Sequence, residues 1–181
     1  MTFRRGVLLP LVGLAVMTAA GCDSTEPQST PTPTYRLEPR PVRPGEVALD
    51  GHAVSDGDTT FFPIGLTTGL DMLVGSHAEF APKGEFVRVR VVVTNKGRSS
   101  VLFNTRRQLL VLADGKQLKP DDPAMLVKRQ PGQFELGPAD RLEFDLYYDM
   151  PKGAQVVALM GFGGPTLTDM KDATGTRIPL T

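Results

Sequence analysis

Two segments with strict period-two hydrophobicity restrict this chain to a fold rich in β-strands. Residues 86–94, "FVRVRVVVT", carry valine at every second position, alternating with Arg88, Arg90, Val92 and Thr94. Residues 141–150, "RLEFDLYYDM", place apolar and aromatic residues on one face and mainly charged residues on the other. Because successive side chains of a strand point to opposite faces, this spacing predicts two half-buried strands.

A hairpin signal and weaker strand patterns occupy much of the remaining chain. Asp114 and Gly115 lie between the two extended segments of "QLLVLADGKQL", and both residue types tolerate positive φ. Apolar runs at residues 61–66, 155–160 and 176–180 predict further strands, and no segment after Cys22 keeps a helical period over twelve residues. About seven short strands separated by turn residues predict an all-β fold, an antiparallel β-sandwich.

The only cysteine, Cys22, follows the pattern of an export signal. Arg4 and Arg5 precede an uncharged run at residues 6–20, and small residues at 19–21 lead to Cys22. This run is shorter than the ~20 residues of a membrane-spanning helix, so residues 1–21 are predicted to be a signal peptide. The motif "AAGC" resembles the lipobox of bacterial lipoproteins, which implies that Cys22 is lipidated. We expect a protein anchored in the cell membrane by lipid and facing the extracytoplasmic side, exported by the general secretory or the twin-arginine route.

Composition divides the rest of the chain into a spacer and one domain. Residues 22–43 are dense in Pro, Ser and Thr, which predicts a semi-stiff linker before a domain at residues 44–181. Without residues 1–21, 18 basic residues face 20 acidic ones, a net charge of −2. This balance predicts no nucleic-acid partner. With no cysteine beyond Cys22, the domain has no internal disulfide and is held together by burial.

Three motifs together resemble a known family. They are "GEFVRVRVVVTNKG", "LLVLADGKQLKPD" and "ELGPADRLEFDLYYDMPKGA". In this order they are similar to a family of immunoglobulin-like extracellular domains of unknown function that many Gram-positive lipoproteins carry. That family looks related to a small secreted immunoprotective antigen of mycobacteria. The resemblance covers roughly residues 44–181, implies an immunoglobulin-like order of strands, and brings no enzymatic residues with it.

An immunoglobulin-like order predicts which strands pair. The strand at 86–94 is expected to lie antiparallel beside the strand at 141–149. The outward Arg88 and Arg90 are then expected opposite Glu143 and Asp145, as exposed ion pairs worth ~0.2–1 kcal/mol each.

The sequence shows no pattern typical of an active site or a cofactor site. Ser76 and His77 are adjacent, so on an extended chain their side chains point to opposite faces and cannot form a nucleophile–base pair. His52 has no such neighbour. The carboxylates of "DGDTT" at residues 56–60 lack the further ligands of a calcium loop, and a solvated turn is the better interpretation. We therefore predict no enzyme activity, no metal and no cofactor.

Two classes of function remain. The first is a binding or structural module at the cell envelope whose exposed loops contact an envelope or surface protein or a surface polymer. The second is a lipid or small-ligand carrier at the cell surface, which requires an internal cavity. Because a sandwich normally packs its two faces about 10 Å apart and leaves no room between them, the first class is favoured.

A long connection at residues 119–138, "KPDDPAMLVKRQPGQFELGP", is the candidate for a partner contact. It contains Met125, Leu126 and Val127, followed at once by Lys128 and Arg129. In one interpretation these apolar residues form a short edge strand or turn that covers one end of the core. In the other, part of the group is exposed beside the two cations and anchors a partner. Burial of the three apolar side chains decides between them.

Overall fold

The structure, a computed structural model, describes residues 41–50, 52–166 and 174–180. The predicted signal peptide, most of the predicted linker and the predicted lipidation at Cys22 lie outside these residues. Among the described residues, no helix has both the length and the apolar character needed to span a membrane.

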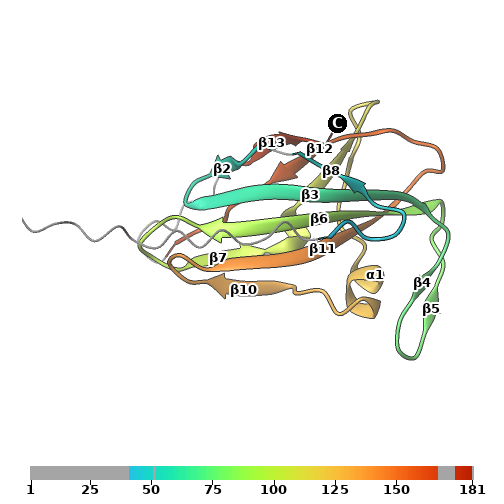
Figure 1. The fold of residues 1–181 in the computed structure, drawn as a ribbon, viewed down its shortest axis with the longest axis horizontal. Helices are drawn as coiled ribbons and strands as arrows, with labels where there is room; N and C mark the ends of the chain where they lie inside the picture. The colour runs from blue at the N-terminus through green and yellow to red at the C-terminus, as the bar shows by residue number, and fades with distance from the viewer. Residues whose placement is uncertain (1–40, 51, 167–173, 181) are drawn as a thin grey trace, which may run out of the picture. The chain divides into compact units, whose positions relative to one another are not determined.

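The domain consists of three long strands, β3, β6 and β11, together with shorter strands and two short helices (Figure 1). The strands are β1 (Val47–Ala48), β2 (Val54–Asp56), β3 (Thr59–Leu70), β4 (Leu73–Val74), β5 (Glu79–Phe80), β6 (Glu85–Asn95), β7 (Val101–Asn104), β8 (Leu109–Leu112), β9 (Gln117–Leu118), β10 (Gln133–Leu136), β11 (Arg141–Met150), β12 (Val156–Gly161) and β13 (Thr176–Pro179). The helices are a 3-10 turn, η1 (Thr105–Arg107), and an α-helix, α1 (Asp122–Val127).

Two antiparallel layers form the sandwich. In the larger sheet β3, β6 and β11 lie side by side, and β1 and β2 pair with different parts of β3. The second layer has the strand order β13-β12-β8-β9, and β7 pairs with β10 in a separate two-stranded sheet. The two-stranded β4–β5 hairpin projects from one end of the larger sheet (Figure 1). The all-β, immunoglobulin-like sandwich expected from the sequence is therefore confirmed.

Aromatic rings fill the space between the layers. Phe61 of β3, Phe103 of β7 and Phe144 of β11 are all buried, and the Phe103 ring centroid lies 5.9 Å from that of Phe61 and 5.8 Å from that of Phe144. A Cβ placed on Gly161 of β12 would come within 3.1 Å of the Phe61 ring, so the backbone of the second layer packs directly on the first. Such close packing leaves the interior to side chains rather than to a ligand.

The period-two patterns predicted the principal strands correctly. β6 and β11 pair antiparallel over ten residue positions, from Arg141 opposite Thr94 to Met150 opposite Glu85. The Asp114-Gly115 turn joins β8 to β9, with Gly115 at φ 85°, a conformation that costs glycine little. β3 is longer than its apolar run indicates, because Thr59 and Thr60 pair with β6 before the run and residues 67–70 continue the pairing after it, through one irregular step between Thr67 and Leu70.

The prediction of a solvated turn at residues 56–60 is only half right. Gly57, at φ 58°, turns the chain between β2 and β3, but Asp56 is buried. Its carboxylate accepts hydrogen bonds from the backbone N–H groups of Gly163 (2.9 Å) and Gly175 (3.2 Å). Asp56 thus ties two C-terminal segments to the β2–β3 turn, a role that needs partners more than one hundred residues away in sequence and so leaves no local signal.

Candidate functional site

The predicted partner-contact residues lie on and just after helix α1. The segment forms a helix rather than the expected edge strand or turn, because Asp121 caps its N-terminus by accepting a hydrogen bond from Ala124 N–H (2.8 Å) and Pro123 occupies the first turn. The helix ends at Val127, and Lys128 is its C-cap. Arg129 then adopts a left-handed backbone conformation with φ 51°.

One side of this segment covers the free edge of β11, the last strand of the larger sheet. The Met125 sulfur accepts a hydrogen bond from Tyr147 N–H (3.4 Å), and the Gln130 side-chain oxygen accepts one from Asp145 N–H (2.7 Å). Asp121 N–H in turn donates to the Tyr147 carbonyl (2.8 Å). An exposed strand edge is a template for unwanted pairing with another chain. The long connection therefore protects a sheet edge, which explains the burial of Met125.

The other side of the segment holds the β4–β5 hairpin. Lys128 Nζ donates to the Val74 carbonyl (3.0 Å), and Arg129 Nη2 donates to the Ser76 hydroxyl (3.1 Å). A Cβ on Gly75 would come within 2.8 Å of the Val127 side chain, so hairpin and helix are in close contact. These contacts join two segments about fifty residues apart in sequence into one surface.

Apolar side chains remain open on this surface. Leu126 is 78% exposed, Val74 59% and Met72 45%, whereas Met125 is 6% exposed. In the described part of the chain neither Lys128 nor Arg129 forms an ion pair with a carboxylate. The α1–β4/β5 surface, defined as Met72, Val74, Leu126, Lys128 and Arg129, thus combines aliphatic groups with two uncompensated positive charges.

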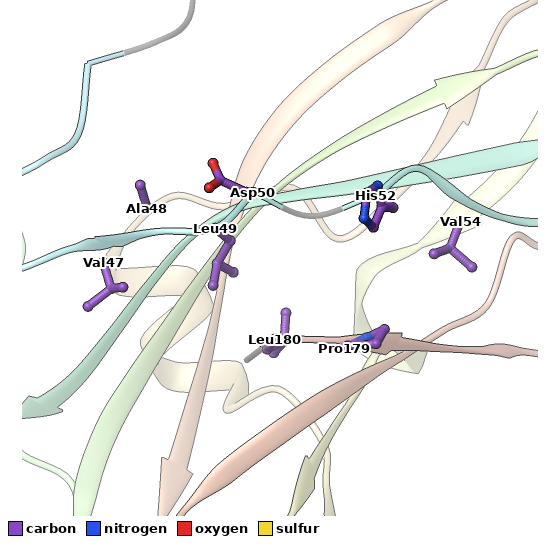
Figure 2. A pocket seen from close by; sticks show the side chains of 8 residues that line it. All are labelled: Val47, Ala48, Leu49, Asp50, His52, Val54, Pro179 and Leu180. Carbon is purple, nitrogen blue, oxygen red and sulfur yellow. The ribbon is translucent and has the colours of Figure 1, made fainter.

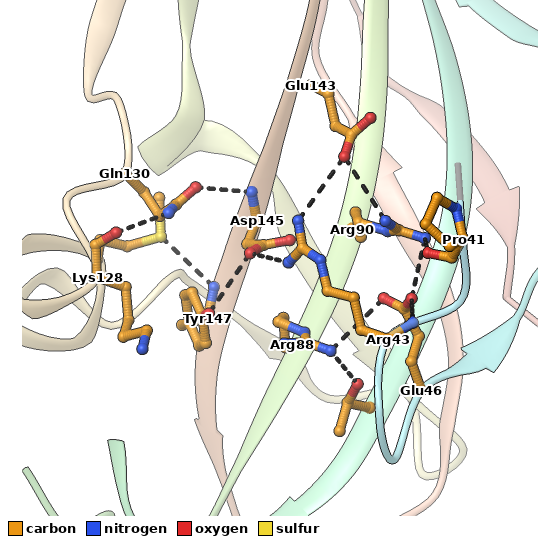
Figure 3. Close-up of polar contacts among 12 residues, drawn as sticks. Pro41, Arg43, Glu46, Arg88, Arg90, Lys128, Gln130, Glu143, Asp145 and Tyr147 are labelled. Atoms are coloured by element: carbon orange, nitrogen blue, oxygen red, sulfur yellow. Dashed lines mark hydrogen bonds and ion pairs between the residues drawn. The ribbon is translucent and has the colours of Figure 1, made fainter. Parts of the chain in front are cut away.

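A second polar feature, which the sequence did not predict, lies on the outer face of the larger sheet. Figure 3 shows residues 41–46 running across that face as a strap, with Arg43 and Glu46 inserted among charged side chains of β6 and β11. Glu46 accepts from Arg90 Nη2 at 2.9 Å and lies 3.6 Å from Arg88 Nη2. Arg43 Nη1 lies 2.6 Å from Asp145 Oδ2, and Arg43 Nη2 lies 3.7 Å from Glu143 Oε1.

The expected exposed pairs between β6 and β11 are therefore wrong in two respects, the residue opposite Arg88 and the exposure of the charged side chains. The two strands do pair, and Arg90 lies opposite Asp145, but Tyr147 rather than a carboxylate is opposite Arg88. Arg90 and Glu46 have only 4% and 1% of their side chains exposed. The period-two pattern identified the charged face correctly, but the strap that buries it carries no hydrophobic signal of its own.

Burial changes the ionisation of groups beside this network. Burial and the neighbouring Asp145 charge together raise the pKa of Tyr147 to about 12. Burial alone raises the pKa of Tyr148, whose hydroxyl donates to the Gln108 carbonyl (3.1 Å). Burial would lower the pKa of Arg43, but the hydrogen bond to Asp145 and its charge outweigh that effect and raise it. Tyr147 and Tyr148 thus remain neutral, and Arg43 charged, at ordinary pH.

The two histidines lie in different parts of the domain. His77 is exposed at the tip of the β4–β5 hairpin, where the neighbouring Ser76 hydroxyl accepts from Arg129. His52 lines a pocket of about 460 Å³ between the β1–β2 segment and β13, with Asp50 at its rim (Figure 2). The remaining walls are mainly aliphatic and are formed by Val47, Ala48, Leu49, Val54, Pro179 and Leu180.

Fold and site together define an immunoglobulin-like β-sandwich with a helix-and-hairpin surface at one end. Comparison with protein families shows which family this is. The chain belongs to the family described as "Domain of unknown function (DUF4352)", whose model matches residues 51–170. A search of curated proteins found no match.

Three solved structures are similar to this chain at low sequence identity. The yjhA protein from Bacillus subtilis is 18% identical, with 59% of this chain and 75% of that chain covered and a TM-score of 0.44. A conserved hypothetical protein from Bacillus anthracis is 11% identical, with 76% and 98% covered and a TM-score of 0.49. The secreted protein MPT63 from Mycobacterium tuberculosis is 15% identical, with 68% and 88% covered and a TM-score of 0.38.

Proposed function

We propose that this chain is a lipoprotein of the cell envelope whose sandwich domain binds another envelope protein. In this proposal Cys22 carries the lipid that holds the protein on the extracytoplasmic side of the cell membrane. Residues 22–43 form the spacer, of which residues 41–43 lie on the domain, and an extended chain of this composition and the remaining length reaches roughly 60 Å. The domain can then meet partners at that distance from the membrane. The residues that contact the partner are Leu126, Lys128 and Arg129, together with the hairpin.

The observation that carries this proposal is the 78% exposure of Leu126 on a helix whose end contacts the β4–β5 hairpin through Lys128 and Arg129, two cations that form no ion pair with a described carboxylate. A side chain needed only to cover the sheet edge would be buried, as Met125 is. The buried core of an interface is more apolar than the rest of a protein surface and is enriched in methionine and arginine, and exposed apolar patches mark binding sites. The chemistry fits a protein partner with an apolar centre and an acidic rim.

The strap supports the tethering part of the proposal. The chain enters the domain through residues 41–46, and Arg43 and Glu46 fix that entry point to β6 and β11 by ion pairs. A pull transmitted by the spacer therefore acts first on ion pairs to β6 and β11, two long strands that pair over ten positions, before it reaches β1. This arrangement suits a domain that must stay folded while its partner is bound.

The test compares surface variants in cells by chemical crosslinking. Leu126→Ser and Arg129→Glu should each reduce the yield of the crosslinked partner at least severalfold, because they remove an apolar anchor and reverse a rim charge. Leu102→Ser, on the exposed side of β7, is the matched control and should leave the yield unchanged. The melting temperature of every variant must match the wild type within a few degrees. Equal yields for Leu126→Ser and Leu102→Ser would refute the assignment of the surface.

The pocket beside His52 favours a second candidate, a carrier of a lipid or small ligand. Its volume of about 460 Å³ and its aliphatic walls suit an acyl chain or a small apolar molecule. Native mass spectrometry of the purified protein distinguishes the candidates. A co-purifying small molecule that is lost in Leu49→Trp, which fills the pocket, supports the carrier; ligand-free protein that still captures its partner supports the binding module.

A further inference from the structure

Three lysines from different turns line one groove at an end of the sandwich. Lys83 precedes β6, Lys116 lies in the β8–β9 turn, and Lys152 lies in the β11–β12 turn. The groove has a volume of about 510 Å³. No pattern along the sequence indicates this group, because the three residues come from three separate loops that only the fold brings together.

The turns that carry these lysines are fixed by hydrogen bonds from backbone N–H groups to aspartate carboxylates. The Asp149 carboxylate accepts hydrogen bonds from Lys83 N–H (2.8 Å) and Gly84 N–H (3.1 Å). A Cβ on Gly84 would collide with the carbonyl of the β11 end and lie 3.1 Å from Lys152 N, so the first and third turns are in contact. The Asp114 side chain accepts from Lys116 N–H (2.9 Å) and fixes the second turn. The lysine backbones therefore keep their spacing without a ligand.

The ammonium groups themselves are uncommitted. All three lysines are exposed, and no hydrogen bond or ion pair of their side chains occurs within the described ranges. Two carboxylates also line the groove, Asp149 and Asp121, but each is occupied by backbone N–H donors. The charges nearest to the lysines are thus already partly compensated by N–H groups, which leaves the ammonium groups available to an external anion.

We propose that this groove binds a linear, phosphate-bearing polymer. Lysine is a common point-charge partner of phosphate, and several ammonium groups along one groove attract successive phosphates more strongly than one isolated anion. The volume is far larger than a single phosphate needs, so a chain of phosphate groups fits better than a free ion. This site shares no residue with the α1–β4/β5 surface, although Asp121 at the N-cap of α1 lines it, and it adds a polyanion to the protein partner proposed above.

The test uses inorganic polyphosphate as the probe and full-length protein purified in a neutral detergent. Binding of a fluorescently labelled chain is measured by anisotropy at low and high salt. The triple variant Lys83→Gln, Lys116→Gln, Lys152→Gln should weaken binding roughly tenfold or more, since each exposed contact contributes a small, salt-sensitive share. Because all three side chains are exposed, the variant should fold with an unchanged melting temperature.

A matched control removes the same charge from the opposite end of the sheet. Lys96, Arg98 and Arg141 are exposed near the other ends of β6 and β11, roughly 30 Å from the groove by the rise per residue of a strand. Their triple glutamine variant should keep binding within about twofold of the wild type. Equal loss in both triples would overturn the proposal, because it would show attraction to overall charge only.

Two further outcomes also decide. Absence of polyphosphate binding at low salt overturns the proposal. Binding to phosphatidylglycerol vesicles that depends on the three lysines and is stronger than binding to polyphosphate would assign the groove to lipid headgroups. That result would overturn the proposal of a polymer ligand. Leu126→Ser should leave polyphosphate binding intact, so failure of this inference and failure of the proposed protein contact can be told apart.

Discussion

Replacing Glu46 by Gln should strongly destabilise the domain, although the change keeps the size of the side chain. The Glu46 carboxylate is 1% exposed, accepts from Arg90 at 2.9 Å and from Arg43 N–H at 3.0 Å, and lies 3.6 Å from Arg88. The variant leaves two carboxylates, those of Glu143 and Asp145, opposite three guanidinium groups. These groups belong to Arg43, Arg88 and Arg90, on a face that the strap shields from solvent.

The magnitude follows from the burial of this network. Removing one partner of a buried ion pair typically costs 3–5 kcal/mol, because the remaining charge stays desolvated. A folded domain has only about 5–15 kcal/mol in total, so the loss is a large fraction. For a domain of this size the loss corresponds to roughly 10–15 °C in melting temperature.

The control is the exposed pair of Arg106 and Asp122. Arg106 Nε lies 2.7 Å from Asp122 Oδ1, which is shorter than any contact of Glu46, but the two side chains are 64% and 62% exposed. An exposed pair contributes about 0–1 kcal/mol whatever its distance. Asp122→Asn should therefore cost less than about 1 kcal/mol. Urea unfolding of both variants at neutral pH gives the two values, and a cost below about 1 kcal/mol for Glu46→Gln would refute the reasoning from burial.

Three other changes test separate parts of the structure. A Cβ on Gly65 would overlap the Glu46 carboxyl group, so Gly65→Ala should lower the free energy of unfolding about as much as Glu46→Gln. Because the two residues are in contact, their effects should not add in the double variant, and additive losses in urea unfolding would contradict this contact. The raised pKa of Tyr147 contributes stability that is complete below pH 10 and is lost as pH rises toward 12, so Tyr147→Phe should make the alkaline decline shallower, with buried Tyr148 contributing to what remains. An identical pH profile of unfolding would exclude a contribution from Tyr147. Cys22→Ser should move the protein from the membrane fraction to the medium or to an uncleaved precursor, whereas unchanged processing and retention would disprove lipidation.

The sequence predicted the sheet far better than it predicted the surfaces. Alternating valines in β6 and alternating aromatic and charged residues in β11 reflect a local rule of strand geometry, so the strands and the fold class could be predicted. The pairing of β6 with β11 was predicted from the immunoglobulin-like order that the family resemblance implies. The partner of each charged side chain depends on tertiary structure. Glu46 reaches Arg90 from a segment of Pro, Gly and charged residues, and nothing in that segment indicates burial.

The candidate site was predicted in part for the same reason. Residues 125–129 could be singled out because a long connection with three successive apolar residues is unusual. That Met125 would turn inward to the β11 edge while Leu126 faces out follows from a helix that is too short to leave a periodic signal. The hairpin side of the surface, with Val74 and Ser76, could not be inferred, because its contact with Lys128 and Arg129 spans about fifty residues.

Site-specific photo-crosslinking in living cells tests the proposed binding surface most directly. A photoreactive residue at position 126, 78% exposed on α1, should give one discrete adduct with an envelope protein, and Arg129→Glu in the same chain should reduce that adduct. The same residue at position 102, 41% exposed on β7, should give none. No adduct at position 126, or the same adducts at both positions, would contradict the proposal that this domain binds its partner through α1 and the β4–β5 hairpin.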